Sequence, residues 1–409
     1  MSSISVIVPV FNGAPYIRQA LNSILRQTFS PCEVLVVDDG SADETPSILR
    51  DFGSLITVLT QANRGLPAAR NRALDVAHGE YIAFLDADDL WSPTFLATVV
   101  EAITAQPPTV VGVCTGWMYT DRDGNPLPHT RRHSDRPVDV YKLLQGGQFP
   151  VHATLTRKTA IDQAGRFDEA QRALEDWDLW LRLTVSGSTF ATVQQHLALY
   201  RLHGESMSGD PDRMRQGRLR ALEKLFGRPD LAPELRSLEP QARAAAHAES
   251  SAALYGAGRA EEGQREFVEA VRLWPRVLAT DEPYYALVCA EQPVGYKATS
   301  YPVDLERAEA RLLDALDAAT TALGWRETPA RRRAWGQAYR VLARCAALQR
   351  SRRALLRYAR LAAAHDFAPA ELLAATKALA KSVTWQPPRA PAGPPAAMRD
   401  PAATAGPVR

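Results

Sequence analysis

The chain has few cysteines, no long apolar run and no excess of one charge, and each absence excludes a class of protein. Its four cysteines among 409 residues form no CxxC pair or other metal-type spacing, which predicts a reduced, cytoplasmic setting. No apolar run reaches the roughly 18 residues that span a bilayer. The formal net charge of +2 is too small for nucleic-acid binding by bulk electrostatics, so we expect no nucleic-acid partner.

A glycine-rich turn is also missing after the first apolar segment, where the chain reads Pro9-Val10-Phe11-Asn12-Gly13. A dinucleotide-dependent oxidoreductase needs such a turn. A sugar nucleotidyltransferase would need a basic, glycine-rich loop there to hold a triphosphate. Both classes are therefore disfavoured.

Short apolar runs and helical patterns alternate through the first hundred residues. The pattern predicts strands at Ile4–Val10, Glu33–Val37, Leu55–Thr60 and Tyr81–Leu85, with helices at 16–27, 44–52 and 65–76. This order predicts a parallel sheet with right-handed crossovers, whose ligands bind at the carboxyl ends of the strands. Acidic clusters follow the second and fourth strands, at Asp38-Asp39 and at Asp86-Ala87-Asp88-Asp89.

These acids have the chemistry that a nucleotide-sugar site needs. Asp86 and Asp88 lie two apart on an extended backbone, so both carboxylates can face one divalent cation on a leaving diphosphate. Asp39 can contact a base or ribose, and Glu175-Asp176 opens a predicted helix, where a general base for an acceptor hydroxyl could stand. Each cluster also has a structural alternative, as a turn or a helix cap.

Six segments in this order resemble the family 2 glycosyltransferases, which have the GT-A fold. The resemblance covers roughly the first 210 residues. The matching segments are ISVIVPVFNGAPYI (Ile4–Ile17), VDDGSADET (Val37–Thr45), NRGLPAARNRAL (Asn63–Leu74), GEYIAFLDADD (Gly79–Asp89), GRFDEAQRALEDWDLWLRL (Gly165–Leu183) and YRLHGESMS (Tyr200–Ser208).

The resemblance implies a role for each matching residue. Contacts to the nucleotide, its ribose or the donor sugar are implied for Pro9, Phe11, Asn12, Asp38, Asp39 and Asp86, and Arg70 is implied to lie by the diphosphate or the acidic cluster. Ligation of Mn²⁺ or Mg²⁺ is implied for Asp88, Asp86 and His203. Asp176 is the implied general base, assisted by Glu175, for a single in-line displacement that inverts the anomeric carbon.

Several neighbouring residues have two interpretations. Asp178 competes with Asp176 as the base, and His203 could equally belong to a surface loop. Trp177 and Trp180 could stack on an acceptor sugar, but their apolar neighbours favour a place in the core. His152 could face the acceptor, although a structural histidine is the simpler interpretation.

We therefore predict an α/β domain with a Rossmann-like nucleotide-binding sheet, of the GT-A type, followed by an all-α domain. The transferase domain covers 1–210, with a nucleotide-sugar-binding half at 1–100 and an acceptor half at 101–210. A helical domain covers 211–385, and 386–409 is a disordered tail rich in proline and alanine. Residues 247–275 resemble one tetratricopeptide-type hairpin and 335–367 a weaker copy, with a plain helical bundle as the alternative.

The expected enzyme moves a sugar from a nucleotide diphosphate, taken as UDP, to a glycan, lipid-linked or protein acceptor in bacterial surface glycan assembly. We expect it in the cytoplasm or at the inner face of the membrane. The arginines at 331–333 and 350–353 could touch anionic lipid, although a solvated helix face is the simpler interpretation. The helical domain could bind a protein partner or self-associate. A scaffold protein with an inactive transferase domain is the alternative from another class, and the intact acidic set argues against it.

Overall fold

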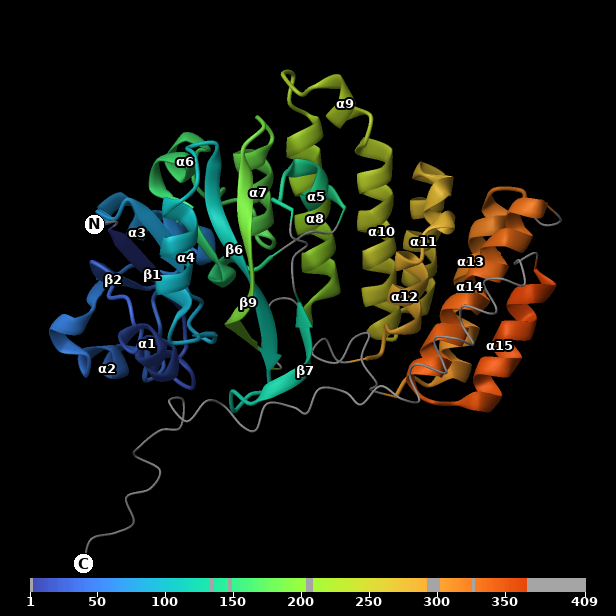
Figure 1. The fold of residues 1–409 in the computed structure, drawn as a ribbon, viewed down its shortest axis with the longest axis horizontal. Helices are drawn as coiled ribbons and strands as arrows, with labels where there is room; N and C mark the ends of the chain where they lie inside the picture. Colours follow the sequence, from blue (N-terminus) through green and yellow to red (C-terminus); the bar gives the residue numbers. More distant parts are fainter. Residues whose placement is uncertain are drawn as a thin grey trace, which may run out of the picture. The chain divides into compact units, whose positions relative to one another are not determined.

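Contacts divide the chain into two compact units. A computed structural model describes residues 3–131, 136–145, 149–203, 209–292, 302–325 and 328–365. The first unit comprises the chain up to Tyr119 together with Thr130–Arg243, and the second comprises Thr120–His129 and the chain from Ala244 onward. Figure 1 shows the elements of both units, coloured along the sequence.

The strands follow the sequence pattern closely in the first hundred residues. They are β1 (Ile4–Val10), β2 (Glu33–Asp38), β3 (Thr57–Thr60), β4 (Tyr81–Phe84), β5 (Leu90–Trp91), β6 (Val110–Thr120), β7 (Pro126–Arg131), β8 (Thr154–Arg157) and β9 (Thr189–Arg201).

The helices of the first unit alternate with these strands and then continue the chain. They are α1 (Ile17–Leu25), α2 (Thr45–Arg50), η1 (Gly53–Leu55), α3 (Leu66–Val76), α4 (Phe95–Thr104), α5 (Val140–Leu144), η2 (Val151–Ala153), α6 (Lys158–Gln163), α7 (Glu175–Thr184), α8 (Pro211–Phe226) and α9 (Pro233–Arg236). The remaining helices are α10 (Glu239–Gly256), α11 (Ala260–Leu273), η4 (Pro275–Ala279), α12 (Glu282–Val288), α13 (Leu305–Ala322), α14 (Pro329–Leu348) and α15 (Arg352–Ala364).

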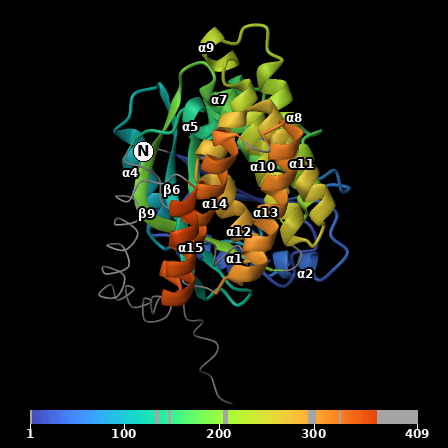
Figure 2. The ribbon, with the colours of Figure 1, turned by 90° about the vertical axis from the view of Figure 1, so that its right-hand side faces the viewer.

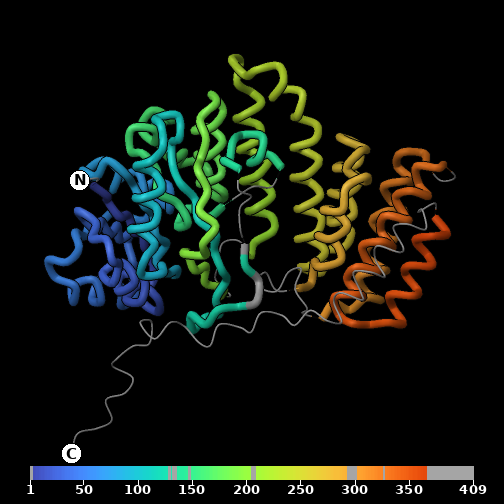
Figure 3. The backbone as a smooth tube through the Cα atoms, in the orientation of Figure 1, coloured from blue at the N-terminus to red at the C-terminus, as the bar shows by residue number. Residues whose placement is uncertain are grey.

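The sheet of the first unit has the strand order β3-β2-β1-β4-β8-β6-β9-β5, and Figure 3 traces the path of the chain through it. The pairs β3–β2, β2–β1 and β1–β4 are parallel, whereas β4–β8, β8–β6 and β9–β5 are antiparallel. Val10 at the end of β1 pairs with Asp38 at the end of β2. The segments that follow these two strands therefore start at one edge of the sheet.

The parallel strands are buried, which explains their continuous apolar sequence pattern. Every residue of Ile4–Val10 is buried, as a β-branched run in a sheet covered on both faces requires. Helix α3 packs on β1 and β2, while α4 packs on β8 and β9. The prediction of an α/β domain followed by helices is confirmed.

Helix α8 belongs to the first unit, which differs from the domain boundary expected at residue 210. Gly217 of α8 lies against Ala173, where an added Cβ would come within 2.5 Å of the Ala173 carbonyl oxygen. Lys224 of α8 pairs with Asp168 at 2.8 Å and with Asp178 at 2.6 Å. These contacts attach the helix to the segment that leads into α7.

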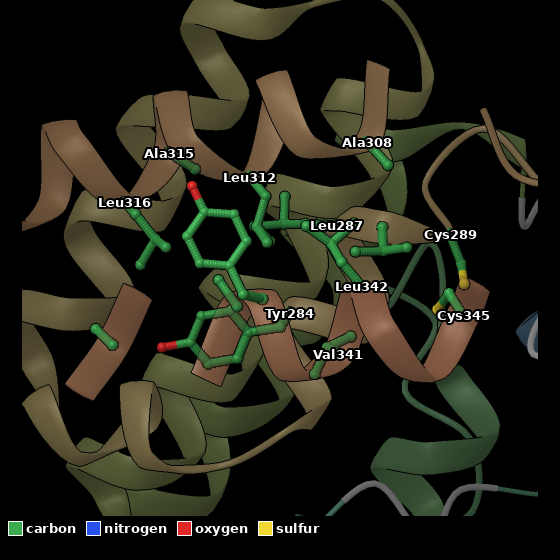
Figure 4. Packing of buried hydrophobic residues seen from close by; sticks show 14 of the residues in the cluster. Tyr284, Leu287, Cys289, Ala308, Leu312, Ala315, Leu316, Val341, Leu342 and Cys345 are labelled. Atoms are coloured by element: carbon green, nitrogen blue, oxygen red, sulfur yellow. The ribbon is translucent and has the colours of Figure 1, made fainter. Parts of the chain in front are cut away.

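The second unit is a helical array around its own apolar core. In Figure 2 these helices are turned toward the viewer, and Figure 4 shows Tyr284, Leu287, Leu312 and Leu342 in the interior. Helix α13 packs on α11, α12 and α14, and α14 packs along α15. The predicted helix breaks at 256–259 and 349–351 are confirmed by the ends of α10 and α14. The predicted tail at 386–409 lies outside the described residues.

Among the parts of the chain that the structure describes, no helix is long and apolar enough to cross a bilayer.

Candidate active site

The loops after β1 and β2 are joined by hydrogen bonds around Asn12. The backbone N–H of Asn12 donates to Ser41 Oγ at 2.9 Å, and its side-chain oxygen accepts from the Ala42 N–H at 2.9 Å. Asn12 has a φ of 50°, a left-handed conformation that asparagine tolerates better than most residues. Pro9 lies within β1, and the neighbouring side chain of Phe11 is half exposed. An aromatic face is therefore accessible next to the end of β1.

Asp39 is buried and already accepts three hydrogen bonds. Its Oδ1 takes the side-chain amide of Gln61 at 2.8 Å and the N–H of Arg64 at 2.9 Å, and its Oδ2 takes the N–H of Gly65 at 2.8 Å. Asp38 accepts the N–H of Ser41 at 2.9 Å. Since an ionised carboxylate offers about four lone-pair sites, Asp39 has little capacity left for a ligand. These hydrogen bonds show that Asp39 holds the segment that begins α3.

Arg70 of α3 connects two of the predicted acids. Its Nη2 donates to Asp86 Oδ1 and its Nη1 donates to Glu175 Oε1, each at 2.6 Å. The Arg70 side chain is 1% exposed, and its Nε has no hydrogen-bond partner among the described residues. Burial alone would lower the pKa of Arg70, but the carboxylates of Asp86 and Glu175 raise it. The guanidinium therefore stays charged and holds the end of β4 against the start of α7.

Helix α7 presents Glu175 and Asp176 in its first turn, directly after a left-handed residue. Leu174 has a φ of 56°, which costs a non-glycine residue about 1–2 kcal/mol. Asp176 is partly exposed, whereas Glu175 is buried against Arg70. Burial of its carboxyl and the charge of Glu175 raise the pKa of Asp176 to about 7. Asp176 can therefore exchange a proton near neutral pH.

The other acid and the two tryptophans of α7 have structural roles. Asp178 is buried and pairs with Arg182 at 2.8 Å and Lys224 at 2.6 Å, so it is not available as a competing base. Trp177 and Trp180 are buried, which supports the core interpretation over stacking on a sugar. Their indole N–H groups donate to backbone carbonyls at 3.3 Å.

Asp88 and His203 form a pair whose geometry suits a divalent cation. His203 Nε2 lies 2.8 Å from Asp88 Oδ2, and the Asp88 side chain is 35% exposed. Carboxylate oxygen and imidazole nitrogen are both ligands of divalent metals. The two side chains are hydrogen bonded to each other in this structure, and together they could hold one divalent ion.

A second set of potential ligands lies deeper. Asp86, Asp89 and His152 bring one ligand atom each within 4.8 Å of one another. His152 is fully buried, with Nδ1 at 2.8 Å from Asp89 Oδ2. Burial raises the pKa of Asp89 to about 6, and the Asp89 carboxylate raises the pKa of His152. Because His152 and Asp89 are both enclosed, a diphosphate has less access here than at Asp88 and His203.

Arg201 is a structural residue of the site that the sequence argument missed. Its Nε donates to the Asp88 carbonyl at 2.6 Å, and its backbone N–H donates to Asp89 Oδ1 at 2.7 Å. It therefore fixes the Asp86–Asp89 turn to the end of β9, two residues before His203. The only available signal was its place in the segment Tyr200–Ser208, which carried the family resemblance.

The chain is similar in sequence to known glycosyltransferases. The family description "Glycosyl transferase family 2" matches residues 5–163. The glycosyltransferase TuaG of Bacillus subtilis, provisionally assigned to teichuronic acid biosynthesis, is 31% identical over 212 residues, which are 51% of this chain and 82% of TuaG. An uncharacterized glycosyltransferase of Rickettsia typhi is 30% identical over 196 residues, or 46% of this chain and 60% of that protein. The chain belongs to glycosyl transferase family 2.

A solved structure extends the similarity in fold. S. aureus TarS in complex with UDP-GlcNAc has a TM-score of 0.53 and 18% identity, with 78% of this chain and 90% of that chain covered. At this identity the match supports the fold alone, which is an α/β GT-A domain followed by helices. The chain spans about 60% of the length of the first curated relatives that it matches.

Proposed function

We propose that this protein is an inverting, metal-dependent glycosyltransferase that moves a sugar from a nucleotide diphosphate, UDP in the first instance, to an acceptor hydroxyl. One observation carries the proposal. Arg70 binds Asp86 and Glu175 at 2.6 Å each, so the acids after β4 and those at the start of α7 belong to one cluster. Donor-binding and proton-accepting groups are then close enough to act on one substrate pair.

We assign donor binding to the carboxyl ends of β1, β2 and β4. Phe11 and Asn12 would border the base, with Pro9 beneath them, and Asp38 and Asp39 would support the ribose end through the turns that they hold. Support for a nucleotide-sugar donor comes from family membership and from TarS, whose structures were determined with UDP and with UDP-GlcNAc. A diphosphate would lie next to the carboxylates of Asp86 and Asp88 only with a divalent cation between them.

We assign Asp88 and His203 as the ligands of Mn²⁺ or Mg²⁺, with Asp86 at the edge of the same site. The ion would neutralise the charge that develops on the leaving diphosphate. Support comes from the 2.8 Å separation of the two ligand atoms and from the partial exposure of Asp88. Arg70 compensates the charge of Asp86 on the other side of the site.

We assign Asp176 as the general base. The acceptor oxygen forms a bond to the anomeric carbon, the bond from that carbon to the diphosphate oxygen breaks with its electron pair on the diphosphate, and the acceptor proton passes to Asp176. A raised pKa of about 7 suits this exchange near neutral pH. Glu175 cannot share the role while it accepts the Arg70 guanidinium, so it is a positioning residue. A single displacement inverts the anomeric centre.

The setting follows from the relatives and stays part of the proposal. TuaG carries a provisional assignment to teichuronic acid biosynthesis, which supports a role in bacterial surface glycan assembly. The acceptor would be a glycan, a lipid-linked sugar or a protein. A nucleotide-sugar donor is consistent with a cytoplasmic enzyme, or one at the inner face of the membrane. The second unit would bind a protein partner or a second copy of this chain. Its helices would form a short array of the tetratricopeptide type.

Donor screening tests the proposal most broadly. UDP-, GDP- and dTDP-sugars, each with Mn²⁺ or with EDTA, would be compared by thermal unfolding, since a ligand at a hundred times its dissociation constant stabilises the fold by about 2.7 kcal/mol. We expect one nucleotide to raise the unfolding midpoint only with metal. Release of the nucleoside diphosphate from that donor would then be measured. No protection by any donor, with or without metal, would contradict the proposal and favour the scaffold alternative.

Asp176→Asn tests the base assignment separately. We expect donor binding within about twofold of wild type and a transfer rate lower by about a hundredfold or more. Glu169→Gln is the control, because Glu169 is an exposed acid before α7 that pairs with Arg64. Lost donor affinity with unchanged transfer at saturation would reassign Asp176 to the donor site.

A further inference from the structure

The helical hairpin of α14 and α15 carries charge of one sign. Residues 328–365 contain ten arginines, no lysine and no acidic residue. The whole chain has a formal net charge of only +2, so the residues outside this hairpin together carry a net charge of −8. This is the strongest local concentration of charge in the described part of the second unit.

Some of these arginines are compensated by acids of neighbouring helices. Asp281 pairs with Arg340 and Arg344 at 2.6 Å, and the remaining pairs are Arg331–Asp317 at 2.9 Å and Arg357–Glu309 at 2.6 Å. The others are exposed and have no ion pair among the described residues: Arg332, Arg333, Arg350, Arg352, Arg353 and Arg360. Packing within the unit therefore does not account for their charge.

Half of these uncompensated arginines gather where α14 turns into α15. We call Leu348–Leu356 the hairpin tip. It contains Arg350, Arg352 and Arg353, all exposed, between Leu348, which is 44% exposed, and Leu356, which is 53% exposed. In the described part of the second unit, these two leucines are the only large hydrophobic side chains exposed to this degree. Cationic and apolar groups are thus combined at one end of the hairpin.

The tip has a fixed backbone. The N–H of Ser351 donates to the Ala346 carbonyl at 2.9 Å, and the N–H of Arg350 donates to the Ala347 carbonyl at 3.0 Å. The side chain of Gln349 donates to the Val303 carbonyl at 3.1 Å. The backbone that carries these side chains therefore needs no further ordering on binding, which lowers the entropic cost.

We propose that the hairpin tip docks on the surface of an anionic membrane. Guanidinium groups form charge-assisted hydrogen bonds with phosphate oxygens of lipid headgroups, while leucine side chains enter the boundary between headgroups and acyl chains. A nucleic acid or an anionic polymer would engage the arginines but would leave Leu348 and Leu356 in water. The exposed leucines are what favour a bilayer. The proposal does not depend on the catalytic assignment.

Vesicle co-sedimentation of the full chain tests the proposal. Vesicles of phosphatidylcholine with phosphatidylglycerol would be compared with pure phosphatidylcholine, at about 0.1 M and 0.5 M salt. We expect binding only to the anionic vesicles, and weaker binding at high salt, because the Debye length falls from about 10 Å at 0.1 M to about 3 Å at 1 M. Equal binding to both vesicles, or none to either, would overturn the proposal.

A matched pair of variants locates the surface. Arg352→Glu/Arg353→Glu lies at the tip, and Arg332→Glu/Arg333→Glu makes the same charge change at the other end of α14, about 22 Å away along the helix. Near an anionic surface each arginine contributes about fivefold in affinity, so the tip variant should bind at least about 25-fold more weakly. The control should lose much less. Equal losses in both would show that overall charge, and not the tip, governs binding.

A third variant separates a bilayer from other polyanions. Leu348→Ser/Leu356→Ser should weaken vesicle binding while its salt dependence stays that of wild type. Undiminished binding in this variant, with competition by soluble polyphosphate, would assign the surface to an anionic polymer and overturn the membrane proposal. All the substituted side chains are exposed, and unchanged unfolding midpoints would confirm intact folds.

Discussion

Replacing Arg70 with methionine should strongly destabilise the first unit. Arg70 is almost fully buried and pairs at 2.6 Å with both Asp86 and Glu175, whose side chains are 28% and 7% exposed. Removing one partner of a buried ion pair typically costs about 3–5 kcal/mol, because the other charge is left uncompensated. Here two carboxylates lose one partner, so we expect a loss toward the upper end of that range.

Urea denaturation measures this loss, and Arg64→Met is the matched control. Arg64 pairs with Glu169 at 2.9 Å, with side chains that are 60% and 45% exposed, and such pairs contribute about 0–1 kcal/mol. Arg70→Met/Glu175→Gln should recover part of the loss, because a neutral amide is less costly to bury than an unpaired carboxylate. A loss below about 1 kcal/mol, or one equal to that of Arg64→Met, would refute this reasoning.

Three further predictions concern catalysis and the attachment of α8. The transfer rate should rise about tenfold per pH unit below about 7 and level off above it, because Asp176 must be deprotonated; a flat profile from pH 5 to 8 would exclude it as the base. Asp176→Asn should raise the free energy of unfolding more at pH 8 than at pH 4. The folded-state pKa of Asp176 lies above its ordinary value of 3.8, so the wild-type fold loses stability as the pH rises toward 7 and the asparagine variant does not. Equal effects at both pH values would contradict this. Gly217→Ala should lower the free energy of unfolding by about 1–3 kcal/mol, because its Cβ would meet the Ala173 carbonyl. Gly209→Ala is the control, because a Cβ there has open space. Equal free energies of unfolding for the two variants would contradict the packing.

Sequence reasoning performed well where local pattern decides structure. The β-branched run at Ile4–Val10 predicted a buried strand because parallel strands are covered on both faces. Likewise, Gly256–Arg259 predicted the break between α10 and α11, since small residues and a glycine end helices. These features depend on neighbours in the sequence.

Features that depend on distant contacts were not predictable in the same way. Helix α8 opens the helical half of the sequence, and tertiary contacts such as Gly217 against Ala173 and Lys224 beside Asp178 attach it to the first unit. The short strand β5 pairs with β9 more than a hundred residues later, so no local periodicity reveals it.

The candidate site shows the same division. The sequence located the acids, because family segments and strand ends mark them, and it identified Arg70 as a neighbour of the acidic cluster. It could not show that Asp39 is engaged by Gln61, Arg64 and Gly65, since those bonds depend on how the loop folds. Nor could it separate Asp176 from Asp178, which differ only through their tertiary partners.

The most direct test of the separate roles proposed for Asp88 and Asp176 is calorimetry. The preferred nucleotide sugar would be titrated into two variants in the presence of Mn²⁺. Asp88→Ala should bind the donor at least about tenfold more weakly than wild type, because it removes a proposed metal ligand. Asp176→Asn should bind it within about twofold, because that carboxylate acts only on the acceptor proton. The reverse result, with donor affinity kept in Asp88→Ala and lost in Asp176→Asn, would contradict the proposed site.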